Sequence, residues 1–119
     1  MEPENLEKRR YKRVICSFPI QYRDIRKSDT HTEGSLTGNI SEGGVYFTSS
    51  EFMPLAGRFA LEISLPNLSR PIKAISKVAW IRKSPSSDQY ELGSKFLEMR
   101  NEDKAHIVNF LAAITPQQA

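Results

Sequence analysis

Apolar and polar residues alternate with a period of two along most of the chain, which is the pattern of β-strands with one buried face. The first such run covers residues 14–23. Its buried face is expected to hold Val14, Cys16, Phe18, Ile20 and Tyr22. Pro19 lies within this run and has no N–H for a strand ladder, so we expect an edge or a bulge there.

Five further segments continue this pattern as short strands. They are expected at residues 36–40, 45–48, 59–65, 72–83 and 90–96. The polar segment 24–34 is expected to be an exposed loop. Within the segment 72–83 the register is ambiguous because neighbouring residues are apolar, although Val78 and Trp80 are expected to share one face.

The period changes near the C-terminus, where apolar residues follow the i, i+3, i+4, i+7 spacing of an amphipathic helix. These residues are Ile107, Phe110, Leu111 and Ile114. Asn101 is a suitable N-cap, and Glu102 and Asp103 suit the positive end of the helix dipole. Pro116 is expected to end the helix.

Six short antiparallel strands with one helix predict an all-β fold. We expect a six-stranded antiparallel β-barrel with a C-terminal α-helix, because closure removes the exposed strand edges. A length of 119 residues fits one domain with its own core. The expected division is a flexible N-terminal leader at 1–7, a single domain at 8–115 and a C-terminal tail at 116–119.

The composition indicates the cellular compartment in which the protein is expected. No apolar run is long enough to span a bilayer, and no apolar segment follows the first charges as a secretory signal would require. The lone Cys16 has no partner for an intramolecular disulfide. These features favour a bacterial, cytoplasmic protein without a membrane span.

The positive charge is local rather than global. The net charge is only +3, which is small for a protein whose whole surface binds nucleic acid. The stretch KRRYKRV, at 8–14, nevertheless holds five cations within six positions. This concentration indicates a local anionic partner.

Residues that carry catalytic or metal chemistry are sparse. His31 lies in a polar segment and His106 beside the apolar stripe of the helix, and neither has other ligands at metal-binding spacing. Cys16 falls on an apolar strand face, as a core thiol does. The glycines match neither of the common phosphate-binding fingerprints. We therefore expect no enzyme activity, no metal and no cofactor.

Two motifs stand in order along the chain. Arg9 and Arg13 are four positions apart with Arg10 between them, and the stretch NISEGG follows after the first strand. The polar and glycine positions of this second motif are Asn39, Ser41, Gly43 and Gly44. Taken alone, NISEGG reads as a hairpin turn whose two glycines accept positive φ.

R-x-x-x-R followed by [DN]-x-S-x-x-G resembles the PilZ domain family. The resemblance extends over nearly the whole chain, through VYFTSSEFMPLAGRFALEISLP, KVAWI, YELGSKFLEM and NEDKAHIVNFL. It implies a six-stranded barrel with a closing helix and, as in many members, binding of the bacterial second messenger cyclic di-GMP. The ligand-binding residues that it implies are Arg9, Arg10, Arg13, Asn39, Ser41, Gly43 and Gly44, with Lys8 as a further candidate.

The chemistry of these residues agrees with that ligand. An arginine fork pairs with phosphate oxygens or with guanine O6 and N7, whereas the lysine at position 8 offers only a point charge. If Asn39 and Ser41 lie in extended chain, their side chains point to one face. Asn39 stands where many members have Asp, so base contacts are expected to differ. The two glycines would let the ligand approach the backbone.

Tyr11, Trp80 and Tyr90 are the candidates for stacking on a base, although Trp80 on an apolar strand face fits the core better. The function expected from the resemblance is a non-catalytic cyclic di-GMP receptor or adaptor, whose N-terminal arginine segment reorders on binding and signals to an unidentified downstream protein partner. Two alternatives stay open. One is a PilZ-like interaction module without the ligand, and the other, less favoured, is a small barrel that binds single-stranded nucleic acid.

Overall fold

The computed structural model describes residues 14–26 and 32–114. The strands are β1 (Val14–Ile15), β2 (Pro19–Asp24), β3 (Glu33–Ile40), β4 (Val45–Ser49), β5 (Arg58–Ile63), β6 (Ile72–Lys83) and β7 (Tyr90–Met99). One helix, α2 (Asn101–Ile114), follows the last strand. The predicted order of strands and helix is confirmed, although β3 begins three residues before the predicted strand and β7 ends three residues after it.

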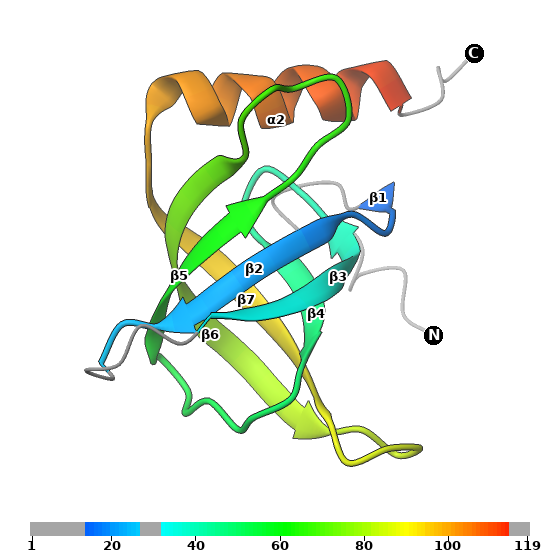
Figure 1. The fold of residues 1–119 in the computed structure, drawn as a ribbon, viewed down its shortest axis with the longest axis vertical. Helices are drawn as coiled ribbons and strands as arrows, with labels where there is room; N and C mark the ends of the chain where they lie inside the picture. Colours follow the sequence, from blue (N-terminus) through cyan, green and yellow to red (C-terminus); the bar gives the residue numbers. More distant parts are fainter. Residues whose placement is uncertain (1–13, 27–31, 115–119) are drawn as a thin grey trace, which may run out of the picture.

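The strands close into a barrel. Its hydrogen-bonded order is β3-β2-β5-β6-β7-β4, and the pairing of β4 with β3 completes the ring. All pairings are antiparallel. The short β1 pairs with β3 beside β2 and is the detached start of the same strand. The predicted six-stranded antiparallel barrel with a C-terminal helix is therefore confirmed (Figure 1).

The interruption between β1 and β2 is organised by one buried side chain. The Thr37 hydroxyl accepts the Phe18 N–H at 3.0 Å and donates to the Cys16 carbonyl at 2.7 Å, so it takes the place of a ladder partner. Thr37 is only 2% exposed. Pro19, for which the sequence predicts an edge or bulge, is the first residue of β2, where its missing N–H is tolerated.

The inner faces of the strands form one continuous core, which α2 closes at one end of the barrel (Figure 1). The most deeply buried side chains are Ile40, Phe47, Phe59, Leu61, Ile63, Ile72, Leu92 and Ile107. Phe110 of α2 packs edge-on against Phe18, with ring centroids 5.1 Å apart. Burying Ile107 and Leu111 of the helix contributes about 1.5–3 kcal/mol for each side chain.

The start of α2 differs from the prediction by one position. The Lys104 N–H donates to the Arg100 carbonyl at 3.0 Å, so Arg100 rather than Asn101 occupies the N-cap position. Asp103, which is 4% exposed, accepts the Lys73 N–H at 3.2 Å. This carboxylate therefore fastens the first turn of the helix to β6, in addition to complementing the helix dipole.

The expectation that Val78 and Trp80 share one face is wrong. The register between β6 and β7 shifts between Val78 and Trp80, which pair with Ser94 and Gly93 respectively. The extra residue on β6, Ala79, forms a bulge. A bulge re-aims the side chains that follow it, so Val78 is buried in the core while Trp80 lies half-buried on the outside.

Candidate functional site

Asn39 lies on the outer surface of the barrel near the end of β3. Its neighbour Ile40 is completely buried, so the alternation of the strand turns Asn39 outward. It pairs with Ile15 of β1 on one side and with Tyr46 of β4 on the other. The half-buried Asn39 amide makes no side-chain hydrogen bond within the part of the chain that the structure describes.

A row of residues continues from Asn39 across three more strands. Tyr46 pairs with Gly93 of β7, and Gly93 pairs with Trp80 of β6. Directly paired residues on antiparallel strands project from the same face. We call Asn39, Tyr46, Gly93 and Trp80 the aromatic row.

The two rings of the aromatic row lie against the barrel wall. Their centroids are 5.7 Å apart and their planes differ by 22°, which is a stacked pair. A Cβ added to Gly93 would lie 2.2 Å from the Trp80 Nε1, and one added to Gly38 would lie 2.3 Å from the Tyr46 ring. These two glycines thus provide the space in which the rings lie flat.

A guanidinium ends the row. The Arg82 guanidinium carbon lies 5.8 Å from the centre of the Trp80 ring, within cation–π range. Its Nε also donates to Glu91 Oε1 at 2.7 Å, while 68% of the Arg82 side chain stays exposed. The row therefore combines an outward-facing amide, two stacked rings and a cation, a set that suits a flat heteroaromatic ligand.

Ser41 closes the turn that follows β3. Its hydroxyl oxygen accepts the N–H groups of Gly43 at 3.1 Å and Gly44 at 3.3 Å, and the residue is 8% exposed. β3 ends at Ile40, so Ser41 lies one residue beyond the strand that holds Asn39. In this structure Ser41 shapes the turn beside the aromatic row.

The two motif glycines do not have positive φ, contrary to the expectation for this turn. A Cβ on Gly44 would lie only 1.8 Å from the Ser94 carbonyl oxygen of β7. The Gly43 carbonyl accepts the Phe96 N–H at 2.8 Å, so the turn is held against β7. Gly44 is therefore needed because another strand approaches its backbone closely, and β7 fills the space that a side chain at position 44 would take.

Lys8, Arg9, Arg10 and Arg13 lie outside the described residues, as does Tyr11. The structure nevertheless fixes where the chain enters the barrel, because Val14 pairs with Ile40, the residue after Asn39. The first described residue therefore lies beside the second motif.

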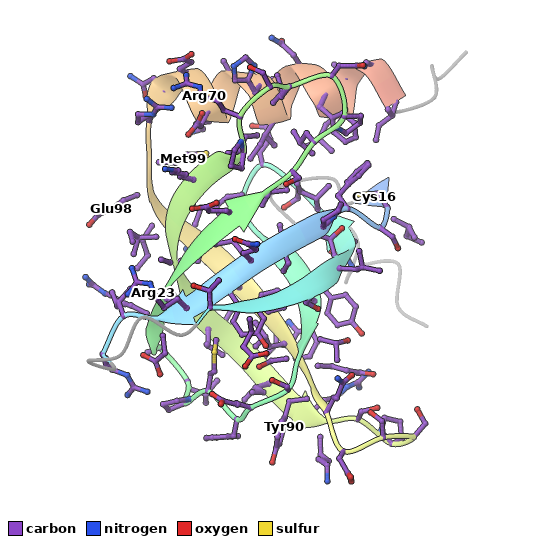
Figure 2. The ribbon with its side chains drawn as sticks, in the orientation of Figure 1. Cys16, Arg23, Arg70, Tyr90, Glu98 and Met99 are labelled. Carbon is purple, nitrogen blue, oxygen red and sulfur yellow. The ribbon has the colours of Figure 1, made fainter. Side chains whose placement is uncertain are left out.

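The other candidates lie elsewhere. Tyr90 contacts Phe52 edge-on, 5.7 Å between centroids, at the opposite end of the barrel from α2 (Figure 2). Burial raises the pKa of the Cys16 thiol, and its hydrogen bond with Thr37 offsets this only in part, so the thiol stays protonated at neutral pH. No group of three metal-ligating side chains occurs among residues 14–26 and 32–114. Within the same ranges, no helix is both long and apolar enough to cross a membrane.

Sequence reasoning missed Tyr46 and Arg82 as site residues. Tyr46 was visible as the outward position between Val45 and Phe47, whose side chains are buried. The position of Arg82 depends on the bulge at Ala79, which has no counterpart in the hydrophobic pattern.

Comparison with known proteins agrees with this architecture. The PilZ domain family model matches residues 7–113, so the chain belongs to the PilZ domain family. No curated protein sequence matches the chain.

Solved PilZ-type structures share the fold at low sequence identity. The Bacillus subtilis inhibitor of motility MotI (DgrA) has a TM-score of 0.73 and 19% identity over 89% of this chain. The PilZ domain of YcgR from Escherichia coli with c-di-GMP has a TM-score of 0.67 and 15% identity over 90% of this chain and 91% of that domain. The K. pneumonia MrkH–c-di-GMP complex has a TM-score of 0.68 and 14% identity over 90% of this chain. The chain spans about half the length of MotI and MrkH, 50% and 51% respectively.

Proposed function

We propose that this protein is a non-catalytic receptor for cyclic di-GMP, which it binds between its N-terminal arginine segment and the aromatic row. Membership of the PilZ domain family supports this proposal, and two structures with the same fold, YcgR and MrkH, are of complexes with c-di-GMP. The arginine motif and the NISEGG motif both occur in this chain, in the order that the family pattern requires.

One observation carries the proposal. The pairing of β1 with β3 places Ile15 opposite Asn39 and Val14 opposite Ile40. Arg13 directly precedes Val14, and Arg9 is separated from Val14 by at most about 17 Å of extended backbone. The length of this connection lets the arginines reach a ligand that rests on the aromatic row.

Each part then has a separate chemical task. Arg9 and Arg13 pair with the phosphates or with guanine O6 and N7. The Asn39 amide donates to and accepts from a guanine edge, and the Trp80–Tyr46 stack receives the face of a base. Ser41 and Gly44 act indirectly, because they hold the turn that borders the row.

We further propose that binding orders the arginine segment against the barrel and that a partner protein reads the changed surface. Repulsion among five neighbouring cations opposes a fixed arrangement, and two phosphates reduce this repulsion by neutralising part of the charge. Such an order change is a common form of ligand switch. Amide hydrogen exchange of residues 8–13 tests it, with protection expected only in the presence of cyclic di-GMP.

Calorimetry with cyclic di-GMP is the decisive experiment. Micromolar binding is expected, and cyclic di-AMP is the matched control because it carries the same phosphates on adenine. If the folded protein releases no heat with cyclic di-GMP, it does not bind this ligand. The result would then favour the alternative of a protein-interaction module without the ligand. Equal binding of both dinucleotides would mean that the guanines are not read.

A second candidate function is the binding of single-stranded nucleic acid. The outward-facing stack of Tyr46 and Trp80 favours it, because proteins of this kind stack bases on aromatic side chains. This function predicts a steep loss of oligonucleotide affinity with salt and no preference for cyclic di-GMP over oligonucleotides. A titration of a short single strand at two salt concentrations separates it from the receptor.

A further inference from the structure

A groove crosses the outer surface of β2, β5, β6 and β7, away from the aromatic row. Its cavity volume is about 560 Å³, and its apolar lining includes Ala60, Ile75 and Met99. A second hollow of about 510 Å³ adjoins it beneath Arg70 and shares three lining residues with it, Glu62, Lys73 and Arg100. We call the two hollows together the charged groove. Figure 2 shows Arg23, Glu98, Met99 and Arg70 along one side of the barrel, with Cys16 on the other.

The strand register explains the groove. Arg23, Ala60, Ile75 and Glu98 are successive partners across four strands and form one outward row. Because the Ala60 side chain is short, the surface is hollow in the middle of this row, between the longer side chains on either side. Beyond Ile75 the register of β6 and β7 shifts, and such a bulge increases the local twist of the strands.

The two ends of the groove differ in charge. At the end near α2, three cations, Arg70, Lys73 and Arg100, surround one carboxylate, Glu62. Arg70 and Arg100 have carboxylate neighbours on α2 at 3.8 and 3.5 Å, yet their side chains are 70% and 59% exposed. The Arg70–Glu102 pair is exposed on both sides and is therefore weak. The Arg100 guanidinium is also open to another anion, because its side chain stays largely exposed although Asp103 is buried.

Lys73 carries the strongest indication of an external partner. Its side chain is exposed and forms no ion pair with any residue in the described ranges. It projects from β6 on the same face as Ile75, two positions away, which corresponds to about 6.6 Å along a strand. Alternate side chains of an extended peptide have this same spacing, so one peptide can present an apolar group to Ile75 and a carboxylate to Lys73.

We propose that the charged groove is the docking site for an extended, acidic segment of a partner protein. The segment places an apolar side chain over Ala60 and Ile75 and a carboxylate, two residues further on, between Lys73 and Arg100. A nucleotide fits this site less well, because no aromatic side chain that could stack on a base lines either hollow. The site is separate from the aromatic row and does not depend on the proposed ligand.

NMR titration with a designed peptide tests this proposal. The probe is acetyl-Thr-Leu-Thr-Glu-Thr-Asp-amide, whose Leu, Glu and Asp share one face when extended. Amide shifts are expected at Ala60, Ile75 and Glu98, with millimolar affinity. The matched peptide with Lys in place of Glu and Asp is expected to leave these signals unchanged.

Variants on one strand provide the internal control. Lys73→Glu is expected to weaken the acidic peptide about three- to tenfold, the range for reversing one exposed charge pair. Lys77→Glu, four positions along β6 on the same face but outside the groove, is expected to have no effect. Cyclic di-GMP affinity is expected to be equal in both variants and the parent, which keeps this test independent of the receptor function.

Three results would overturn the proposal. The first is equal binding of the lysine peptide. The second is a set of shifts that leaves out Ala60 and Ile75. The third is the same loss of affinity in Lys73→Glu and Lys77→Glu, since that would reflect net charge rather than a site.

Discussion

The aromatic row and the charged groove lie on the same barrel wall but differ in the side-chain chemistry that selects a ligand. The row is neutral at its centre, with two stacked rings over Gly93 and the Asn39 amide beside them. The groove is lined by aliphatic residues and by charged side chains. The rings favour a flat base, whereas the ions favour an anionic chain.

This contrast shows how a small barrel can hold two binding surfaces without compromising its core. Inward positions of each strand are fixed by packing, whereas outward positions are free to differ from one part of the wall to another. The groove and the row share β6 and β7, since Trp80 and Ile75 lie on one strand and Gly93 and Glu98 on the other. A rigid strand pair thus connects the proposed ligand site with the proposed partner site.

The largest expected effect concerns the turn that supports the aromatic row. Gly44→Ala forces a Cβ to within 1.8 Å of the Ser94 carbonyl, a clash with backbone that a rotamer change does not relieve. We expect a loss of about 3 kcal/mol in the free energy of unfolding, measured with urea. Gly34→Ala is the control, because its Cβ would meet nothing closer than 3.9 Å. Equal stability of the two variants would contradict the role assigned to Gly44.

The second prediction separates the two surfaces by their arginines. Arg13→Ala and Arg9→Ala are each expected to weaken cyclic di-GMP binding by about 1.5–3 kcal/mol, as for charge-assisted hydrogen bonds. Arg23→Ala removes an arginine from the groove and is expected to leave the affinity unchanged. Calorimetry on the three variants measures both effects. If Arg23→Ala also weakened binding, the ligand would not be confined to the side of the barrel that holds the row.

The third prediction concerns the rings. Trp80→Ala is expected to weaken cyclic di-GMP binding by about 1–2 kcal/mol, because a base loses its stacking partner. Tyr90→Ala removes a ring of the same kind at the far end of the barrel, where it contacts Phe52, and is expected to have no effect on affinity. Tryptophan fluorescence, which reports only Trp80 in this chain, is expected to change on ligand addition. An unchanged spectrum at saturating ligand would place the base elsewhere.

The smallest effect concerns the joint between β1 and β2. The pKa of the Cys16 thiol is raised above its ordinary value of 9.0, chiefly by burial. The folded state therefore holds this proton more tightly than the unfolded chain, and the resulting stability is present below pH 9 and is lost as the pH rises through the folded-state pKa. Urea titrations at pH 7 and pH 10 are expected to show a decline that Cys16→Ala reduces. A decline of equal size in the variant would assign it to other groups.

Much of the fold could be predicted because it rests on local patterns. The alternation at Ile20 and Tyr22, and again at Phe59, Leu61 and Ile63, marks strands whatever their partners are. The helical spacing of Ile107 and Leu111 marks α2 in the same way. The motifs also direct attention to Asn39, which the structure places on an open outer surface.

Less of the candidate site could be predicted, since it depends on how strands pair. Trp80 faces outward only because Ala79 bulges against β7, and a bulge is a relation between two strands rather than a property of either. The motif predicts that Ser41 contacts the ligand, but in the structure its hydroxyl oxygen accepts hydrogen bonds from the N–H groups of its own turn. The need for glycine at position 44 arises from Ser94, fifty residues later in the chain.

The sequence by itself determined the class of fold, the number of barrel strands, the closing helix and the two motifs that define the family, because each of these is written in residues close together in the chain. Only the tertiary structure decided that Tyr46 and Trp80 stack beside Asn39, and that Arg23, Ile75 and Arg100 border one groove. The physical reason is that register and bulges are set by the joint packing of distant strands. Those same registers determine which outward side chains become neighbours.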